Sequence, residues 1–170
     1  MNYNKIDKVV FLKYLVICLG ITSIYLCFYT MKIESAISIN DHAAVARHII
    51  SLSVIVPVVE EVVFRKLLLK LLKSLGQWKA VILSAIIFGL CHLDIVQKFY
   101  TFALGVILAI IALKYGTIKY GIMLHMIINL MGVACVFISI YVFYAICIII
   151  TVLSIIIIKK DYKELFNLIK

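Results

Sequence analysis

Residues 56–65 read VPVVEEVVFR, a segment in which two adjacent carboxylates and a guanidinium interrupt an otherwise apolar run. A charged residue at the centre of a membrane helix costs about 2.5–3.5 kcal/mol on insertion scales, so these groups are expected to face protein rather than lipid. Glu61 and Arg65 are four residues apart on one helix face, where they can form a structural ion pair. Glu60 has no such partner on its own helix and requires one from elsewhere in the chain.

Pro57 lies one turn before Glu60. Because proline has no N–H, it leaves the carbonyl of Ser53 without its helical partner and loosens the helix. Irregular backbone at membrane depth is tolerated only where it lines protein or a water-filled cavity. The segment is therefore expected to face the interior of a helix bundle.

The composition of the whole chain indicates a membrane protein. Of its 170 residues, 66% are hydrophobic, the mean hydropathy is +1.20 and there is one proline. Soluble domains are nearer half apolar, and a membrane span needs about 20 apolar residues. The sequence predicts an all-α, polytopic membrane bundle that fills residues 1–170 as one domain. About six transmembrane helices are expected, at Val9–Met31, His48–Leu72, Ala80–Val96, Phe99–Tyr115, Ile118–Met131 and Val133–Ile158. The basic tail, residues 159–170, is expected to lie on the membrane surface.

Basic residues are distributed unevenly between the ends of these helices. With a cytoplasmic N-terminus, three of the 17 basic residues, Lys32, Arg47 and Lys98, fall outside. The other fourteen fall inside: Lys5, Lys8, Lys13, Arg65, Lys66, Lys70, Lys73, Lys79, Lys114, Lys119, Lys159, Lys160, Lys163 and Lys170. The bias follows the positive-inside rule and predicts cytoplasmic N- and C-termini. It also explains the net charge of +9 as a topology signal with attraction to anionic lipid, so no nucleic-acid binding is expected.

The cysteines give no sign of a disulfide framework or a CxxC metal site, because they are odd in number and scattered through apolar runs. They are Cys18, Cys27, Cys91, Cys135 and Cys147. We expect them to be small packing residues.

Two further expected helices carry polar residues inside apolar surroundings. Phe88 and His92 share a face of the third helix, and His125 and Asn129 share a face of the fifth. At about 1.5 Å per residue, these groups and Glu60 lie at overlapping depths, although the count does not show that they meet. A lone intramembrane His or Asn is more often a contact between helices than a catalyst. Two imidazoles, an amide and an unpartnered carboxylate from three helices instead suggest a buried acid–base site.

The chemistry of these residue types leaves two mechanisms open. A carboxylate beside an imidazole can hold and deprotonate a water, while a second imidazole and an amide donate hydrogen bonds to an oxyanion. Alternatively, Glu60, His92 and His125 could bind zinc with one position open for water, although the HExxH signature is absent. Both mechanisms fit hydrolysis of a peptide bond.

Three segments together resemble the CAAX protease and bacteriocin-processing family (CPBP, or Abi) of intramembrane peptidases. The EExxxR, FxxxH and HxxxN motifs of that family match residues 60–65, 88–92 and 125–129, within a core of about residues 48–131. The resemblance implies an endopeptidase without a metal cofactor.

The resemblance also implies a role for each matching residue. Glu60 and His92 would activate a water, and His125 and Asn129 would form the oxyanion site. Structural support would come from Glu61, Arg65, Phe88 and Pro57.

Other functions remain open at this stage. A bacteriocin self-immunity or membrane-interaction protein could have the same fold without catalysis, and a small transporter could use the buried carboxylates, although nothing resembles inverted repeats. The expected partners are the lipid bilayer and a membrane-associated peptide or protein substrate, in a bacterial plasma membrane.

Overall fold

The computed structural model describes residues 5–33, 47, 49–134 and 138–167, and all regular structure in these ranges is helical. Residues 51–75 form one continuous helical segment composed of α, π and 3-10 turns. The described chain therefore contains six helical segments, as the sequence predicts. The elements are α1 (Lys8–Ile33), η1 (Ser51–Ile55), α3 (Val56–Glu61), η2 (Val62–Leu68), α4 (Leu69–Leu72), η3 (Lys73–Leu75), α5 (Gln77–Leu90), α6 (Ile95–Tyr115), α7 (Lys119–Ala134) and α8 (Ile140–Phe166).

Three of the six segments are long and apolar enough to cross a membrane by themselves. They lie in α1, α6 and α8, within Lys8–Cys27, Ile95–Tyr115 and Ile140–Phe166. The α5 helix is apolar but has only 14 residues, which is about 21 Å of helix against a hydrocarbon core of about 30 Å. The prediction of six helices is confirmed for the described residues, and three of these helices have the length and composition of a membrane span.

Some predicted helix boundaries are wrong for identifiable reasons. The third helix ends at Leu90 instead of Val96, and α6 begins at Ile95, because the side chain of Asp94 caps the new helix. Its Oδ1 accepts hydrogen bonds from the amides of Val96 and Gln97 at 2.9 and 3.1 Å. His92 consequently lies in the connection between α5 and α6.

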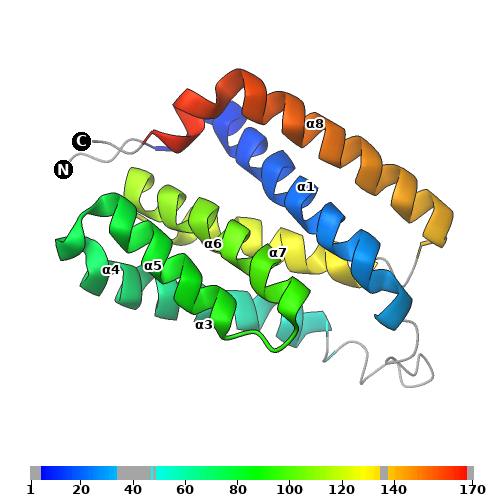
Figure 1. Cartoon of the computed structure of the whole chain (residues 1–170), viewed down its shortest axis with the longest axis horizontal. Coiled ribbons are helices and arrows are strands. Elements are labelled where there is room, and N and C mark those ends of the chain that lie inside the picture. The colour runs from blue at the N-terminus through cyan, green and yellow to red at the C-terminus, as the bar shows by residue number, and fades with distance from the viewer. Residues whose placement is uncertain (1–4, 34–46, 48, 135–137, 168–170) are drawn as a thin grey trace.

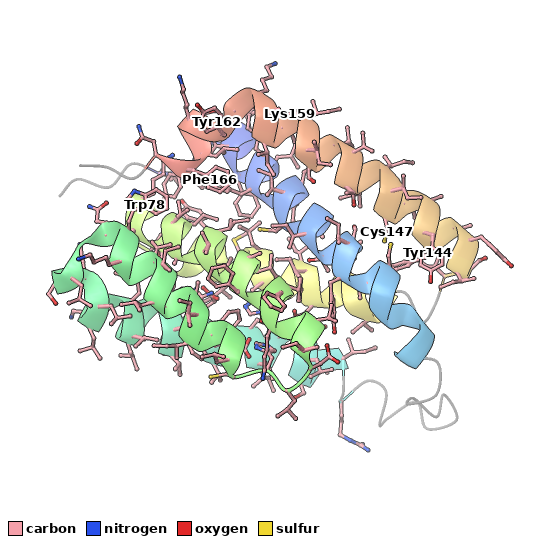
Figure 2. All side chains as sticks on the ribbon, viewed as in Figure 1. Trp78, Tyr144, Cys147, Lys159, Tyr162 and Phe166 are labelled. Carbon is pink, nitrogen blue, oxygen red and sulfur yellow. The ribbon has the colours of Figure 1, made fainter. Side chains whose placement is uncertain are left out.

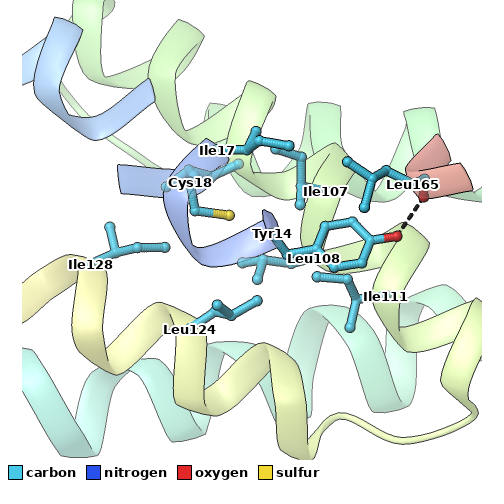
Figure 3. Packing of buried hydrophobic residues seen from close by; sticks show 10 residues of the cluster. Tyr14, Ile17, Cys18, Ile107, Leu108, Ile111, Leu124, Ile128 and Leu165 are labelled. Atoms are coloured by element: carbon cyan, nitrogen blue, oxygen red, sulfur yellow. Dashed lines mark hydrogen bonds between the residues drawn. The ribbon is translucent and has the colours of Figure 1, made fainter. Parts of the chain in front are cut away.

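The end of the chain also differs from expectation. Gly132 does not end its helix, since α7 continues to Ala134. The α8 helix has no break near Ile158 and includes the basic tail as far as Phe166. Leu165 is fully buried there, and its carbonyl accepts a hydrogen bond from the hydroxyl of Tyr14 in α1 (Figure 3). Burial of this apolar side chain holds the tail against the bundle.

The bundle has α1 and α8 side by side on one face, with α6 and α7 between them and the α3–α5 region (Figure 1). The helix ends that carry most basic residues lie together at the left of Figure 1. Trp78, Lys159, Tyr162 and Phe166 mark this end in Figure 2, whereas Tyr144 and Cys147 lie toward the opposite end. The largest apolar core cluster joins α1, α6, α7 and the end of α8: Tyr14, Ile17, Cys18, Leu104, Ile107, Leu108, Ile111, Leu124, Ile128 and Leu165.

The close contact of α1 and α8 depends on Gly20. A Cβ atom at this position would lie 2.2 Å from Ser154 Oγ and 2.5 Å from Ser154 Cβ. The hydroxyl of Thr151, one turn away, also lies 3.5 Å from the Gly20 carbonyl. Small residues are what allow membrane helices to approach this closely.

We predict that Gly20→Ala destabilises the protein by about 1–3 kcal/mol, because the added methyl group overpacks the α1–α8 contact. Thermal unfolding in detergent would show a lower Tm. Adding Ser154→Gly should restore most of the loss, since it removes both clashing atoms. Gly132→Ala is the control because its Cβ would meet no described atom within 4 Å. An unchanged Tm for Gly20→Ala would contradict the packing described here.

Candidate active site

The helical segment that carries the paired glutamates is irregular on both sides of them. The amide of Val56 donates to the carbonyl of Ser51, five residues earlier, so η1 has π-helical hydrogen bonding up to Pro57. After Glu61 the π-helical pattern returns in η2. Single π-helical turns inside α-helices are frequent at functional sites. The short α-helical turn α3 therefore presents the glutamates between two widened turns.

Glu61 and Arg65 form the predicted ion pair. Arg65 Nε lies 3.6 Å from Glu61 Oε2, and both side chains are fully buried. The guanidinium also lies over the ring of Phe88, with Cζ 4.5 Å from the ring centroid, a cation–π arrangement. Removal of one member of a buried pair leaves an uncompensated charge, so these residues are strongly coupled.

His125 bridges both glutamates from α7. Its Nδ1 lies 3.3 Å from Glu61 Oε1, and its Nε2 lies 3.5 Å from Glu60 Oε2. A carboxylate oxygen accepts hydrogen bonds, so an imidazole nitrogen that carries a proton can donate to the glutamate that it faces. Gly121, one turn earlier, makes room for the contact, because a Cβ there would lie 2.7 Å from Glu61 Oε2.

Glu60 differs from Glu61 in its access to the surroundings. The side chain of Glu60 is 23% exposed, whereas that of Glu61 is 0% exposed and that of His125 is 6% exposed. Glu60 has no partner on its own helix, and the partner expected from elsewhere in the chain is His125 on α7. Glu60 is thus the carboxylate of the pair that a water or a substrate can reach.

His92 lies close to this group without a direct hydrogen bond to Glu60 among the described contacts. Its Nδ1 lies 3.0 Å from the backbone carbonyl of Phe88, and its ring packs edge-on against the Phe88 ring at 5.2 Å. Phe88 makes the same kind of contact with His125, at 6.0 Å. The Phe88 ring therefore lies against both imidazoles, and His92 is near enough for electrostatic interaction with Glu60.

Asn129 occupies a different position from the other polar residues. It lies one turn after His125 on α7, and its Nδ2 donates to the backbone carbonyl of Leu52 at 2.8 Å. The structure thus gathers Glu60, Glu61, Arg65, Phe88 and His125, with His92 at the edge and Asn129 on the backbone of η1. The sequence analysis did not predict that the Leu52 carbonyl accepts this hydrogen bond. The available signal was Pro57, five residues later, because proline has no N–H to donate to a carbonyl of the preceding turn.

The donor set gives no ready-made metal site. Within the residues that the structure describes, no three His, Cys, Asp or Glu side chains are grouped so that they could hold a metal ion. Glu60, His92 and His125 are therefore not arranged as three ligands in this conformation. Cys91, adjacent to His92, is exposed and free.

Comparison with known families adds independent evidence. Residues 42–131, slightly more than half of the chain, match the family described as "Type II CAAX prenyl endopeptidase Rce1-like". Comparisons with curated proteins and with solved structures gave no match. The matched range contains the paired glutamates, Arg65, both histidines and Asn129, and three helices are long and apolar enough to cross a membrane. The chain is therefore an integral membrane protein that belongs to the Rce1-like family of type II CAAX prenyl endopeptidases.

Proposed function

We propose that this protein is an intramembrane endopeptidase in which Glu60 activates a water for attack on a peptide bond. The observation that carries the proposal is the unequal exposure of the two glutamates that His125 joins. Glu61 is sealed into an ion pair, whereas Glu60 is partly exposed and keeps an imidazole nitrogen 3.5 Å away. A carboxylate in such a low-dielectric site can hold a water and accept its proton.

The reaction uses this chain's residues in two steps. Glu60 takes a proton as the water oxygen bonds to the peptide carbonyl carbon, which gives a tetrahedral oxyanion. Collapse of this intermediate breaks the C–N bond, and the proton held by Glu60 passes to the leaving amine. His92, at the edge of the site, orients the water beside Glu60.

His125 supplies the electrostatic stabilisation. Its Nδ1 is held by Glu61, which fixes the ring and directs Nε2 toward the exposed side of Glu60. From there Nε2 donates a hydrogen bond to the oxyanion as charge develops on it. The substrate is a membrane-associated protein or peptide, and the enzyme acts in a bacterial plasma membrane.

Glu60→Gln is expected to lower the rate of peptide cleavage by about 10²–10⁴-fold, because an amide cannot accept the proton of the water. The assay uses purified protein in proteoliposomes with a model membrane-proximal peptide. Glu164→Gln is the matched control, since this carboxylate is half exposed at the end of α8, away from the site. Undiminished turnover by Glu60→Gln would contradict the proposal that Glu60 activates the water. If the wild-type chain cleaves no peptide, the alternative of a non-catalytic immunity or membrane-interaction protein gains support.

Arg65→Met is expected to destabilise the fold by about 3–5 kcal/mol, because it leaves the buried Glu61 carboxylate without its guanidinium partner. The double variant Arg65→Met/Glu61→Gln should recover much of this loss, as measured by Tm in detergent. Glu60→Gln should change Tm little, since its side chain is partly exposed. Equal destabilisation by the single and double Arg65 variants would contradict a structural ion pair.

Peptide cleavage is expected to proceed without a stoichiometric metal. Elemental analysis of the active, purified protein should find well under one zinc per chain, and prolonged dialysis against a chelator should leave turnover unchanged. Stoichiometric zinc that disappears in His92→Ala, together with loss of activity, would require a metal-assisted mechanism instead.

A further inference from the structure

We propose that Asn129 is a positioning residue: its side-chain amide replaces the backbone donor that Pro57 withholds from Leu52, and it thereby fixes the helix that carries Glu60. The catalytic consequence rests on the proposed function of Glu60. The contact itself does not.

The hydrogen bonds of η1 show which carbonyl Pro57 leaves without a partner. In a regular α-helix that carbonyl would belong to Ser53, four residues before the proline. Here the Val56 amide already donates to Ser51, five residues back. In the same register the next bond would run from residue 57 to the carbonyl of Leu52, and proline has no N–H to form it.

Asn129 supplies the missing donor. Its Nδ2 lies 2.8 Å from the Leu52 carbonyl oxygen, which is good hydrogen-bond geometry. In lipid no bulk water replaces an absent partner, so an unpaired backbone carbonyl is strongly unfavourable. One side chain of α7 therefore completes the backbone hydrogen bonding of a different helix.

The contact also sets the height of Glu60 relative to the imidazole. His125 and Asn129 are one turn apart on α7, and they hold the segment of residues 51–75 at two levels. Asn129 contacts the backbone carbonyl of Leu52, and His125 contacts the glutamates about two turns further along the same segment. Sliding of the helix would break both, so the amide keeps Glu60 opposite His125 Nε2.

A double-mutant cycle between Asn129 and Pro57 tests the inference in the full-length protein. Pro57→Ala returns an N–H to the helix, so the Leu52 carbonyl gains a backbone partner in either α or π register. Asn129→Ala is expected to lower Tm by about 3–6 °C in the wild-type background and to lower kcat about tenfold. In the Pro57→Ala background both losses should fall to less than about a third of these values. Asn129→Leu, close in size and suited to lipid, repeats the cycle if Asn129→Ala does not fold.

Thr151→Val is the matched control, because its hydroxyl also donates to a backbone carbonyl, that of Cys147, but within regular α8. Its effect on Tm should be the same with and without Pro57→Ala.

The outcomes separate this inference from the proposed function. Equal losses for Asn129→Ala in both backgrounds overturn the positioning role and favour direct contact with the oxyanion. If the Pro57→Ala background restores Tm but not kcat, positioning of the helix does not explain the catalytic role of Asn129, and the inference is also overturned. Coupled Tm values in a protein that cleaves no peptide would support the Asn129–Leu52 contact while the peptidase proposal fails.

Discussion

The buried ion pair of Glu61 and Arg65 is the constraint on which the candidate site depends. Neither charge could remain in an apolar interior alone, and together they need close geometry and further partners. Phe88 provides a ring face for the guanidinium, and His125 provides an N–H toward the carboxylate. Gly121 leaves space for that carboxylate to approach α7. The position of Glu60, the residue just before Glu61, follows from these contacts.

The two carboxylates of the site face one guanidinium, that of Arg65, and one imidazole, that of His125. This grouping of acidic and basic side chains suits an apolar bundle, where a charge without a partner is expensive. The neighbouring π-helical turns give the same segment an irregular backbone where it faces protein and not lipid.

The features that the sequence predicted are those set by periodicity and composition. Six helices follow from apolar runs, and the Glu61–Arg65 pair follows from a spacing of four residues. The connection after α5 was placed too late because Asp94 looks like any polar loop residue until its side chain is seen to cap α6. The bridging role of His125 and the contact from Asn129 to Leu52 were not predictable, since they depend on how α7 lies against another helix. Spacing along one helix reveals shared faces but not contacts between helices.

The short α5 helix has a consequence for the surrounding lipid. About 21 Å of helix against a hydrocarbon core of about 30 Å is a hydrophobic mismatch, and a bilayer responds to it by thinning locally. His92 lies immediately beyond the end of this helix, and the neighbouring Leu93 is 97% exposed. A bilayer that thins beside α5 would bring the headgroup region closer to the edge of the glutamate–histidine cluster and shorten the path from water to Glu60.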